Sequence, residues 1–296
     1  MAEDKNLKAT YQDKKATSCP ICANEFFREV LMSGGGRLIA AKLTDELRRL
    51  YQPSKKYGHI NPLIYPVIVC PECLYAAFPE DFSKINSKKC DDLRNFTERR
   101  RQLVLQTVGD VDFFENRDDR AGAAGYILAL SSYSFFDTGI CPTLKRGLCA
   151  LRAAWLMNDL VEGSEDADEK EKYAYIQKLL YKKANEFYSS SLELLQSGKE
   201  RNDAVVYGPD VDKNWGYDGY LYTLSNLAMK MGYLIEDIEA RAQSYVKAKR
   251  SIAKLFGSGK ASKSKPSEIL DLSRNVYNQL DAYVKEIEES LGKKFD

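Results

Sequence analysis

The sequence predicts a mainly α-helical protein in which a small α+β module at the N-terminal end is followed by an α-helical array. Three observations lead to this prediction. Six of the nine prolines and two C-x-x-C pairs precede residue 80, whereas apolar residues at helical spacing dominate from residue 120 onward. The length of 296 residues suits two domains, and an apolar content of 44% supplies enough material for their cores.

From these composition shifts we expect four segments along the chain. They are a disordered tail at 1–16, a four-cysteine module at 17–85, a connecting helix and loop at 86–118, and a helical repeat-like domain at 119–296. The tail is polar and rich in lysine, without the apolar run of a secretory signal peptide. No later stretch approaches the ~20 apolar residues of a membrane span, so we expect a cytoplasmic protein.

Charge and histidine content narrow the classes of function. The 44 Lys and Arg residues nearly balance 43 Asp and Glu residues, so no overall field attracts nucleic acid or an anionic membrane. Nucleic acid is therefore not an expected partner. His59 is the single histidine, which rules out zinc sites that need two histidines and metalloprotease motifs.

The two C-x-x-C pairs are the candidate metal ligands. Cys19 and Cys22 form the first pair, and Cys70 and Cys73 form the second, which follows a β-branched run at 67–69 that predicts a strand. Two residues between cysteines allow a tight turn to direct both sulfurs at one ion, and proline after the first cysteine favours that turn. We therefore predict a zinc-ribbon-like module with one structural zinc ion.

Redox and iron–sulfur chemistry remain alternatives for these cysteines. A thioredoxin-type C-x-x-C opens a helix within a βαβ unit, whereas this chain has two copies and a strand-like approach to one of them. The pattern favours zinc over both alternatives.

The 47 residues between the pairs are too many for a plain loop and predict structure of their own. We expect a short helix at 44–51, capped by Thr44 and with Leu43, Leu47 and Leu50 on one face. The glycines at 34–36 indicate a turn rather than a phosphate-binding loop. His59 is expected to make a polar loop contact, with contact to the metal as the alternative.

Several motifs surround the two pairs. They are CPIC with Phe26, Asp45, NPLIY at 61–65, and VCPEC followed by YAAF at 75–78 and Asp81-Phe82. In these motifs the chain resembles an uncharacterised bacterial family, the domain of unknown function 2225. The resemblance implies that Cys19, Cys22, Cys70 and Cys73 are the metal ligands and that a tetratricopeptide-like array follows. The family commonly has glycine after the last cysteine. Because this chain has Leu74 there, we expect a strained turn or slightly weaker metal binding.

The second half reads as helices that end near glycines. The expected helices span 120–137, 143–161, 168–196, 217–231, 235–256 and 267–291. A stretch at 224–248 approaches a tetratricopeptide unit, and Ala184 and Tyr188 keep the spacing of its second helix. We predict a tetratricopeptide-like array, with an irregular helical bundle as the alternative.

An aromatic cluster is the candidate partner-binding site. It contains Trp215, Tyr217, Tyr220 and Tyr222, and tyrosine suits grooves that hold peptides because it buries a ring while its hydroxyl stays wet. Packing between helices is the alternative. The run Glu98–Arg101 is expected to be a solvated helix face, with contact to nucleic acid as the lesser alternative.

The sequence contains no G-x-S-x-G motif, Walker loop or dinucleotide fingerprint, and a zinc ion closed by four cysteines leaves no position for substrate. We therefore expect a non-enzymatic, zinc-stabilised adaptor or scaffold that binds another protein through its helical domain. The alternatives are a thiol-based redox switch and a nucleic-acid-binding zinc ribbon protein.

Overall fold

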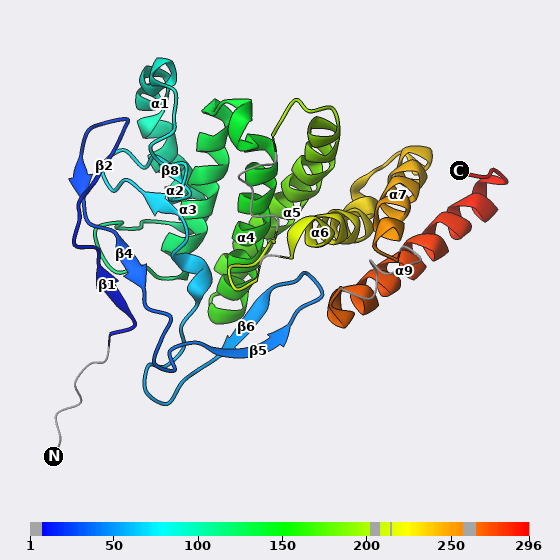
Figure 1. Ribbon diagram of the computed structural model, residues 1–296, viewed down its shortest axis with the longest axis horizontal. Coiled ribbons are helices and arrows are strands. Elements are labelled where there is room, and N and C mark those ends of the chain that lie inside the picture. The colour runs from blue at the N-terminus through cyan, green and yellow to red at the C-terminus, as the bar shows by residue number, and fades with distance from the viewer. Residues whose placement is uncertain (1–7, 202–207, 214, 257–264, 296) are drawn as a thin grey trace. The chain divides into compact units, whose positions relative to one another are not determined.

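The computed structural model describes residues 8–201, 208–213, 215–256 and 265–295 (Figure 1). The chain forms two compact units, the first of residues 1–42 and 49–205 and the second of residues 43–48 and 206–296. Short paired strands dominate the N-terminal part and helices the remainder, which confirms the predicted mainly α fold with a small β-containing N-terminal module. Among the described helices, none is both long and apolar enough to cross a membrane.

The described strands pair two by two. The pairs are β1 (Thr10–Gln12) with β4 (Glu29–Leu31), β2 (Thr17–Ser18) with β3 (Glu25–Phe26), β5 (Ile39–Leu43) with β6 (Arg49–Gln52), and β7 (Ile68–Val69) with β8 (Ala76–Ala77). Strand β1 differs from the predicted disordered tail, because its backbone is ordered by antiparallel pairing with β4, Tyr11 opposite Val30. Residues 1–7 of that tail lie outside the described residues.

Five α-helices lie in the described part of the first unit. They are α1 (Cys90–Asn95), α2 (Thr97–Val108), α3 (Asp119–Ser132), α4 (Pro142–Gly163) and α5 (Ala167–Gln196). Their starts follow the usual signals: the Asp118 side chain accepts a hydrogen bond from the Ala121 amide, and Pro142 is the first residue of α4. Helices α4 and α5 match the predictions, and α3 ends at Ser132, before the predicted end at 137. The connecting helix expected within 86–118 is divided at Phe96 into α1 and α2.

Helix α3 packs directly on the cysteine module. A Cβ atom added to Gly122 would lie 2.6 Å from Cβ of Ile64, and one added to Gly125 would lie 3.4 Å from Val69. The Tyr126 hydroxyl also donates a hydrogen bond of 3.0 Å to the Leu63 carbonyl. The module and the helices of the first unit therefore share one core, and a larger residue at position 122 would separate them.

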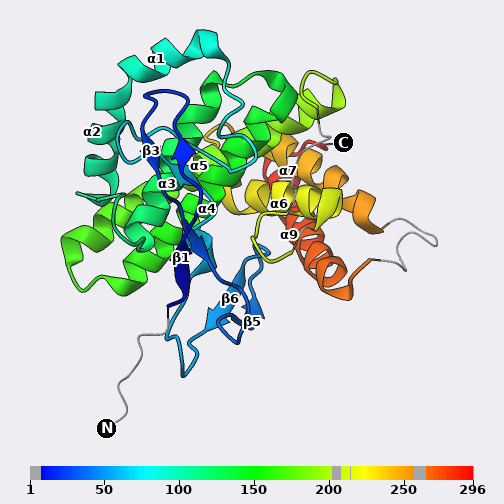
Figure 2. The same ribbon diagram turned by 60° about the vertical axis from the view of Figure 1, so that its left-hand side comes forward.

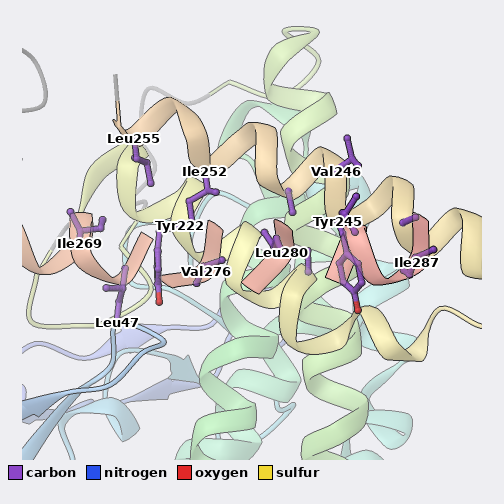
Figure 3. Close-up of a cluster of buried hydrophobic side chains, with 14 of the residues drawn as sticks. Leu47, Tyr222, Tyr245, Val246, Ile252, Leu255, Ile269, Val276, Leu280 and Ile287 are labelled. Atoms are coloured by element: carbon purple, nitrogen blue, oxygen red, sulfur yellow. The ribbon is translucent and has the colours of Figure 1, made fainter. Parts of the chain in front are cut away.

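The second unit contains α6 (Gly216–Met231), α7 (Ile238–Ala253) and α9 (Ser267–Leu291), the yellow to red helices of Figure 2, close to the three predicted ranges. Their apolar faces meet in one cluster (Figure 3), in which α9 contributes buried residues at helical spacing: Ile269, Val276, Leu280, Val284 and Ile287. Gly292, with φ 61°, ends α9 as expected for a helix stop. That these helices form a tetratricopeptide-like array stays a prediction.

Residues 44–51 do not form the helix that the sequence predicted. They form a tight turn, in which the Thr44 hydroxyl accepts hydrogen bonds from the amides of Glu46 and Arg48, followed by most of β6. Leu47 has φ 61°, a left-handed conformation that a right-handed helix cannot contain. Its side chain is fully buried beside Tyr222 in the core of the second unit (Figure 3). Burial in this core therefore prevails over the local helical pattern.

Candidate metal centre

Each cysteine pair lies in a knuckle at the end of a short antiparallel hairpin. Cys19 and Cys22 lie between β2 and β3, and Cys70 and Cys73 lie between β7 and β8. The same backbone hydrogen bonds recur at the same spacing in both knuckles: Ala23 N to Cys19 O at 2.9 Å, Leu74 N to Cys70 O at 2.9 Å, Cys19 N to Asn24 O at 2.9 Å and Cys70 N to Tyr75 O at 2.8 Å. The two halves of the site thus have matching backbone structure.

The residue after each pair has left-handed backbone geometry. Ala23 has φ 62° and Leu74 has φ 56°, so neither left-handed position is occupied by glycine. For a residue with a Cβ atom this conformation costs about 1 kcal/mol. The expectation of strain at Leu74 is therefore confirmed in geometry, and the first knuckle carries the same strain.

The four sulfurs converge on one point. Sγ of Cys19 lies 3.6 Å from Sγ of Cys73, Sγ of Cys22 lies 3.6 Å from Sγ of Cys70, and all four sulfurs lie within 4.8 Å of one another. Four sulfurs bound tetrahedrally to zinc at ~2.3 Å would be separated by about 3.8 Å. The arrangement fits a four-thiolate zinc ion, and both sulfur pairs at 3.6 Å join the two knuckles.

The electrostatics of the cluster favour a bound cation. Hydrogen bonds from Cys19 and Cys73 lower the pKa of the Cys70 thiol to about 2, while the hydrogen bond with Cys70 raises the pKa of Cys19 to about 12. Hydrogen bonds with Cys19 and Cys70, together with burial, raise the pKa of Cys73. The cluster accommodates one thiolate easily and resists further negative charge. A divalent cation would allow Cys19 and Cys73 to ionise as well.

Three arginines from α1 and α2 hold the two knuckles. Arg94 donates to the Ile21 carbonyl of the first knuckle, from Nε at 3.1 Å and from Nη2 at 2.8 Å. On the second knuckle, Arg100 binds the Cys73 carbonyl and Arg101 donates to the Glu72 carbonyl at 2.9 Å. The helices thereby fasten both halves of the site to the same scaffold.

Arg100 corrects the prediction of a solvated helix face at Glu98–Arg101. Its side chain is buried, and besides Cys73 it donates to the Leu93 carbonyl at 2.7 Å. Burial lowers the pKa of this guanidinium, and the neighbouring Cys73, Cys19 and Cys70 oppose that effect. The sequence offered only a run of arginines as a signal, because 27 residues separate Arg100 from Cys73.

The other candidate residues lie elsewhere. His59 is exposed and, within the described ranges, is not part of the cysteine cluster. Trp215, Tyr220 and Tyr222 of the aromatic cluster are buried in the second unit, and Tyr217 is 43% exposed. Three of these four side chains are therefore packing residues in this structure, and partner binding by the cluster stays a prediction.

Comparison with known proteins assigns the chain to a family. A family model described as an uncharacterized protein conserved in bacteria, the domain of unknown function 2225, matches residues 12–280. The chain belongs to this family. An uncharacterized protein of Borreliella burgdorferi is 37% identical over 281 residues, which cover 95% of this chain and 99% of that relative. No solved structure matches the chain.

The structure explains two residues that suggested membership of the domain of unknown function 2225 family. Asp81 is fully buried, pairs with the buried Lys145 ammonium of α4, and accepts a hydrogen bond of 2.9 Å from the Tyr133 hydroxyl. Asn61 caps a short 3₁₀ turn, and its Nδ2 donates a hydrogen bond of 2.8 Å to the Asp119 carboxylate. Both residues join the cysteine module to the helices of the first unit.

Proposed function

We propose that Cys19, Cys22, Cys70 and Cys73 hold one structural zinc ion. The observation that carries this proposal is the convergence of four sulfurs from two matching knuckles within 4.8 Å. Zinc bound by four thiolates would contribute folding free energy to the first unit. Four protein ligands leave no open position for a substrate or a reactive water, which supports a structural role for the ion.

We further propose that the protein is a non-enzymatic adaptor that binds another protein. In support, the sequence lacks motifs for acyl transfer, nucleotide binding and dinucleotide binding. The closed cysteine cluster supplies a rigid scaffold rather than a reactive centre. The same scaffold carries ordered, solvent-exposed apolar side chains, a feature of protein-binding surfaces.

The geometry favours this proposal over the two alternatives. Cys19, Cys70 and Cys73 are buried, whereas thiol switches use accessible thiolates that oxidants can reach. Arg100 and Arg101 hold backbone carbonyls of the second knuckle, which leaves little of the arginine run to bind phosphate.

Metal content per chain tests the zinc proposal. The full chain, purified without added metal, is expected to contain one zinc ion, whereas Cys19→Ser and Cys70→Ser are expected to lose it and to unfold at lower temperature. Cys90→Ser is the matched control, because Cys90 lies outside the cluster and should retain the metal. A metal-free wild-type chain, or one that contains iron, would contradict the proposal.

Proximity labelling of the full chain in bacterial cells tests the adaptor proposal. We expect a protein that is labelled reproducibly above a tag-only control and that binds the zinc-loaded chain when both are purified. Failure to recover any such protein would count against an adaptor.

A further inference from the structure

Three strongly exposed apolar side chains line two adjoining cavities of the first unit. Phe27 is 58% exposed, Leu105 is 59% exposed and Phe114 is 66% exposed. Phe27 and Phe114 line a cavity of about 400 Å³, and Leu105 and Phe114 line a second cavity of about 430 Å³. Pro71 of the second knuckle and Phe113 line both, so the two cavities form one continuous region. We name it the Phe114 surface, formed by Phe27, Pro71, Leu105, Phe113 and Phe114.

The loop that presents Phe114 is fixed at both ends. At its start, Arg120 donates to the Val108 carbonyl at 2.8 Å and to the Asp110 carbonyl at 2.7 Å. At its end, Arg117 Nη1 donates to the Val67 carbonyl at 2.6 Å and the Arg117 amide donates to Glu29. The Phe114 amide itself donates to the Asp112 carboxylate. The ring is therefore held exposed by a preorganised loop, which reduces the entropy lost when a ligand binds.

The rim of the Phe114 surface is acidic. Seven acidic and three basic residues line the two cavities. Two of the basic residues are engaged, since Arg117 binds backbone carbonyls and Arg101 pairs with Glu72 and Glu98. Glu25, Asp110 and Glu115 are exposed, and across the described residues none of these three carboxylates forms an ion pair. A ligand here meets exposed rings surrounded by unpaired negative charge.

We propose that the Phe114 surface binds a cationic peptide segment of a partner protein, one that combines Lys or Arg with an aromatic or aliphatic anchor. The apolar side chains supply the anchor site, and the carboxylates supply charge complementarity. The same charge repels nucleic acid and anionic membranes. The proposal rests on the proposed adaptor function and adds to it the location and the chemistry of the contact.

Selection from a library of random 12-residue peptides, displayed on phage, tests the proposal on the zinc-loaded full chain. We expect the enriched peptides to carry net positive charge and at least one aromatic or leucine residue. The best peptide, made synthetically, should bind at least about tenfold more weakly to Phe114→Ser, because that change removes a central anchor. The affinity of this peptide should also fall for the double variant Glu25→Lys with Glu115→Lys. It should fall for the wild type at high salt as well.

Tyr175→Ser is the matched control, since Tyr175 is a comparably exposed ring on α5 outside both cavities. Full affinity in this variant is expected. The proposal is overturned if no peptide is enriched, if the enriched peptides are neutral or acidic, or if Phe114→Ser binds as the wild type does. Self-association of the chain that Phe114→Ser abolishes would assign the surface to a second copy and also overturn it. If a partner protein found by proximity labelling still binds Phe114→Ser, the Phe114 surface is not its binding site. The proposed adaptor function would then remain supported.

Discussion

The guanidinium of Arg100 donates two hydrogen bonds to the carbonyl of Cys73, from Nε at 2.9 Å and from Nη2 at 2.7 Å. Cys73 is the last cysteine of the cluster, so a side chain of α2 fixes the backbone of the second knuckle directly. The buried Arg100 cation, near Cys73, Cys19 and Cys70, also offsets the negative charge that four thiolates around one zinc ion would leave. The stability of α2 and the retention of metal should therefore depend on each other.

Replacement of Arg100 by methionine tests this dependence. Arg100→Met keeps an apolar stem but leaves the buried carbonyls of Cys73 and Leu93 without their charged donor. We expect the first unit to lose about 2–4 kcal/mol of stability, because an unsatisfied buried polar group costs ~1–3 kcal/mol. Chemical denaturation measures the loss, and competition with a chromophoric chelator should show faster release of zinc.

Arg99→Met is the control for this prediction. Arg99 is the neighbouring residue on α2, is exposed, and lies 5.9 Å from the Phe96 ring. We expect a change of less than about 1 kcal/mol and an unchanged rate of zinc release. Equal effects of the two substitutions would show that the hydrogen bonds of Arg100 do not stabilise the knuckle.

Glycine substitution in the knuckles separates backbone strain from burial. Ala23 is exposed with φ 62°, so Ala23→Gly relieves strain without loss of packing and should stabilise the first unit by about 0.5–1 kcal/mol. Leu74 has a similar φ but is buried, so Leu74→Gly should destabilise by about 1–2 kcal/mol because the burial term is larger. Thermal denaturation of both zinc-loaded variants measures the difference. A destabilised Ala23→Gly variant would refute the argument.

The cysteine cluster could be predicted from the sequence because each knuckle is local. Two residues between cysteines determine where Cys19 and Cys22, or Cys70 and Cys73, point, and the four-thiolate coordination that zinc prefers leads us to expect the two pairs at one site. The long helices were predictable for a similar reason, since their apolar spacing and caps lie within the helix itself.

The remaining features depend on contacts between residues distant in the chain. Arg94 lies 73 residues from the Ile21 carbonyl that it binds, so nothing near Arg94 in the sequence identified its role. Leu47 follows a helical pattern locally but is buried by α6, which the chain reaches only after residue 215. The exposure of Phe114 likewise follows from how Arg117 and Arg120 fix its loop.

Asp119 should give the first unit an unusual dependence on pH. Burial raises the pKa of this carboxyl above its ordinary value, while the hydrogen bond from Asn61 opposes the shift. The native state therefore holds the proton at pH values where the unfolded chain has lost it. This contribution to stability is complete below the unfolded pKa and is lost as the pH rises through the folded pKa.

Comparison with Asp119→Asn isolates this contribution, because the side chain at position 119 cannot ionise in the variant. All other titrating groups are the same in both proteins, so acid release of metal affects both alike. We expect the free energy of unfolding of the wild type, relative to the variant, to fall as the pH rises from 4 to 7. Denaturation at several pH values measures this trend. A relative stability that rises over the same range would show that the carboxylate is stabilised in the fold.

Leu47 provides the final prediction, for the second unit. The turn that carries it is fixed by α6: the Tyr222 hydroxyl and Asn226 Nδ2 both donate to the Asp45 carbonyl, and Lys230 lies 2.7 Å from carboxylate oxygens of Asp45 and Glu46. Leu47→Ala should cost about 2–4 kcal/mol, since it leaves a cavity in the core.

Leu47→Gly distinguishes the effect of backbone conformation from that of packing. It removes the same side chain, but glycine accepts φ 61° without strain, so we expect it to be no less stable than Leu47→Ala. Elsewhere glycine is usually the more costly of the two substitutions, because it adds freedom to the unfolded chain. Chemical denaturation of both variants decides the order. A glycine variant less stable than the alanine variant by ~1 kcal/mol would mean that Leu47 does not keep its left-handed conformation in the folded chain.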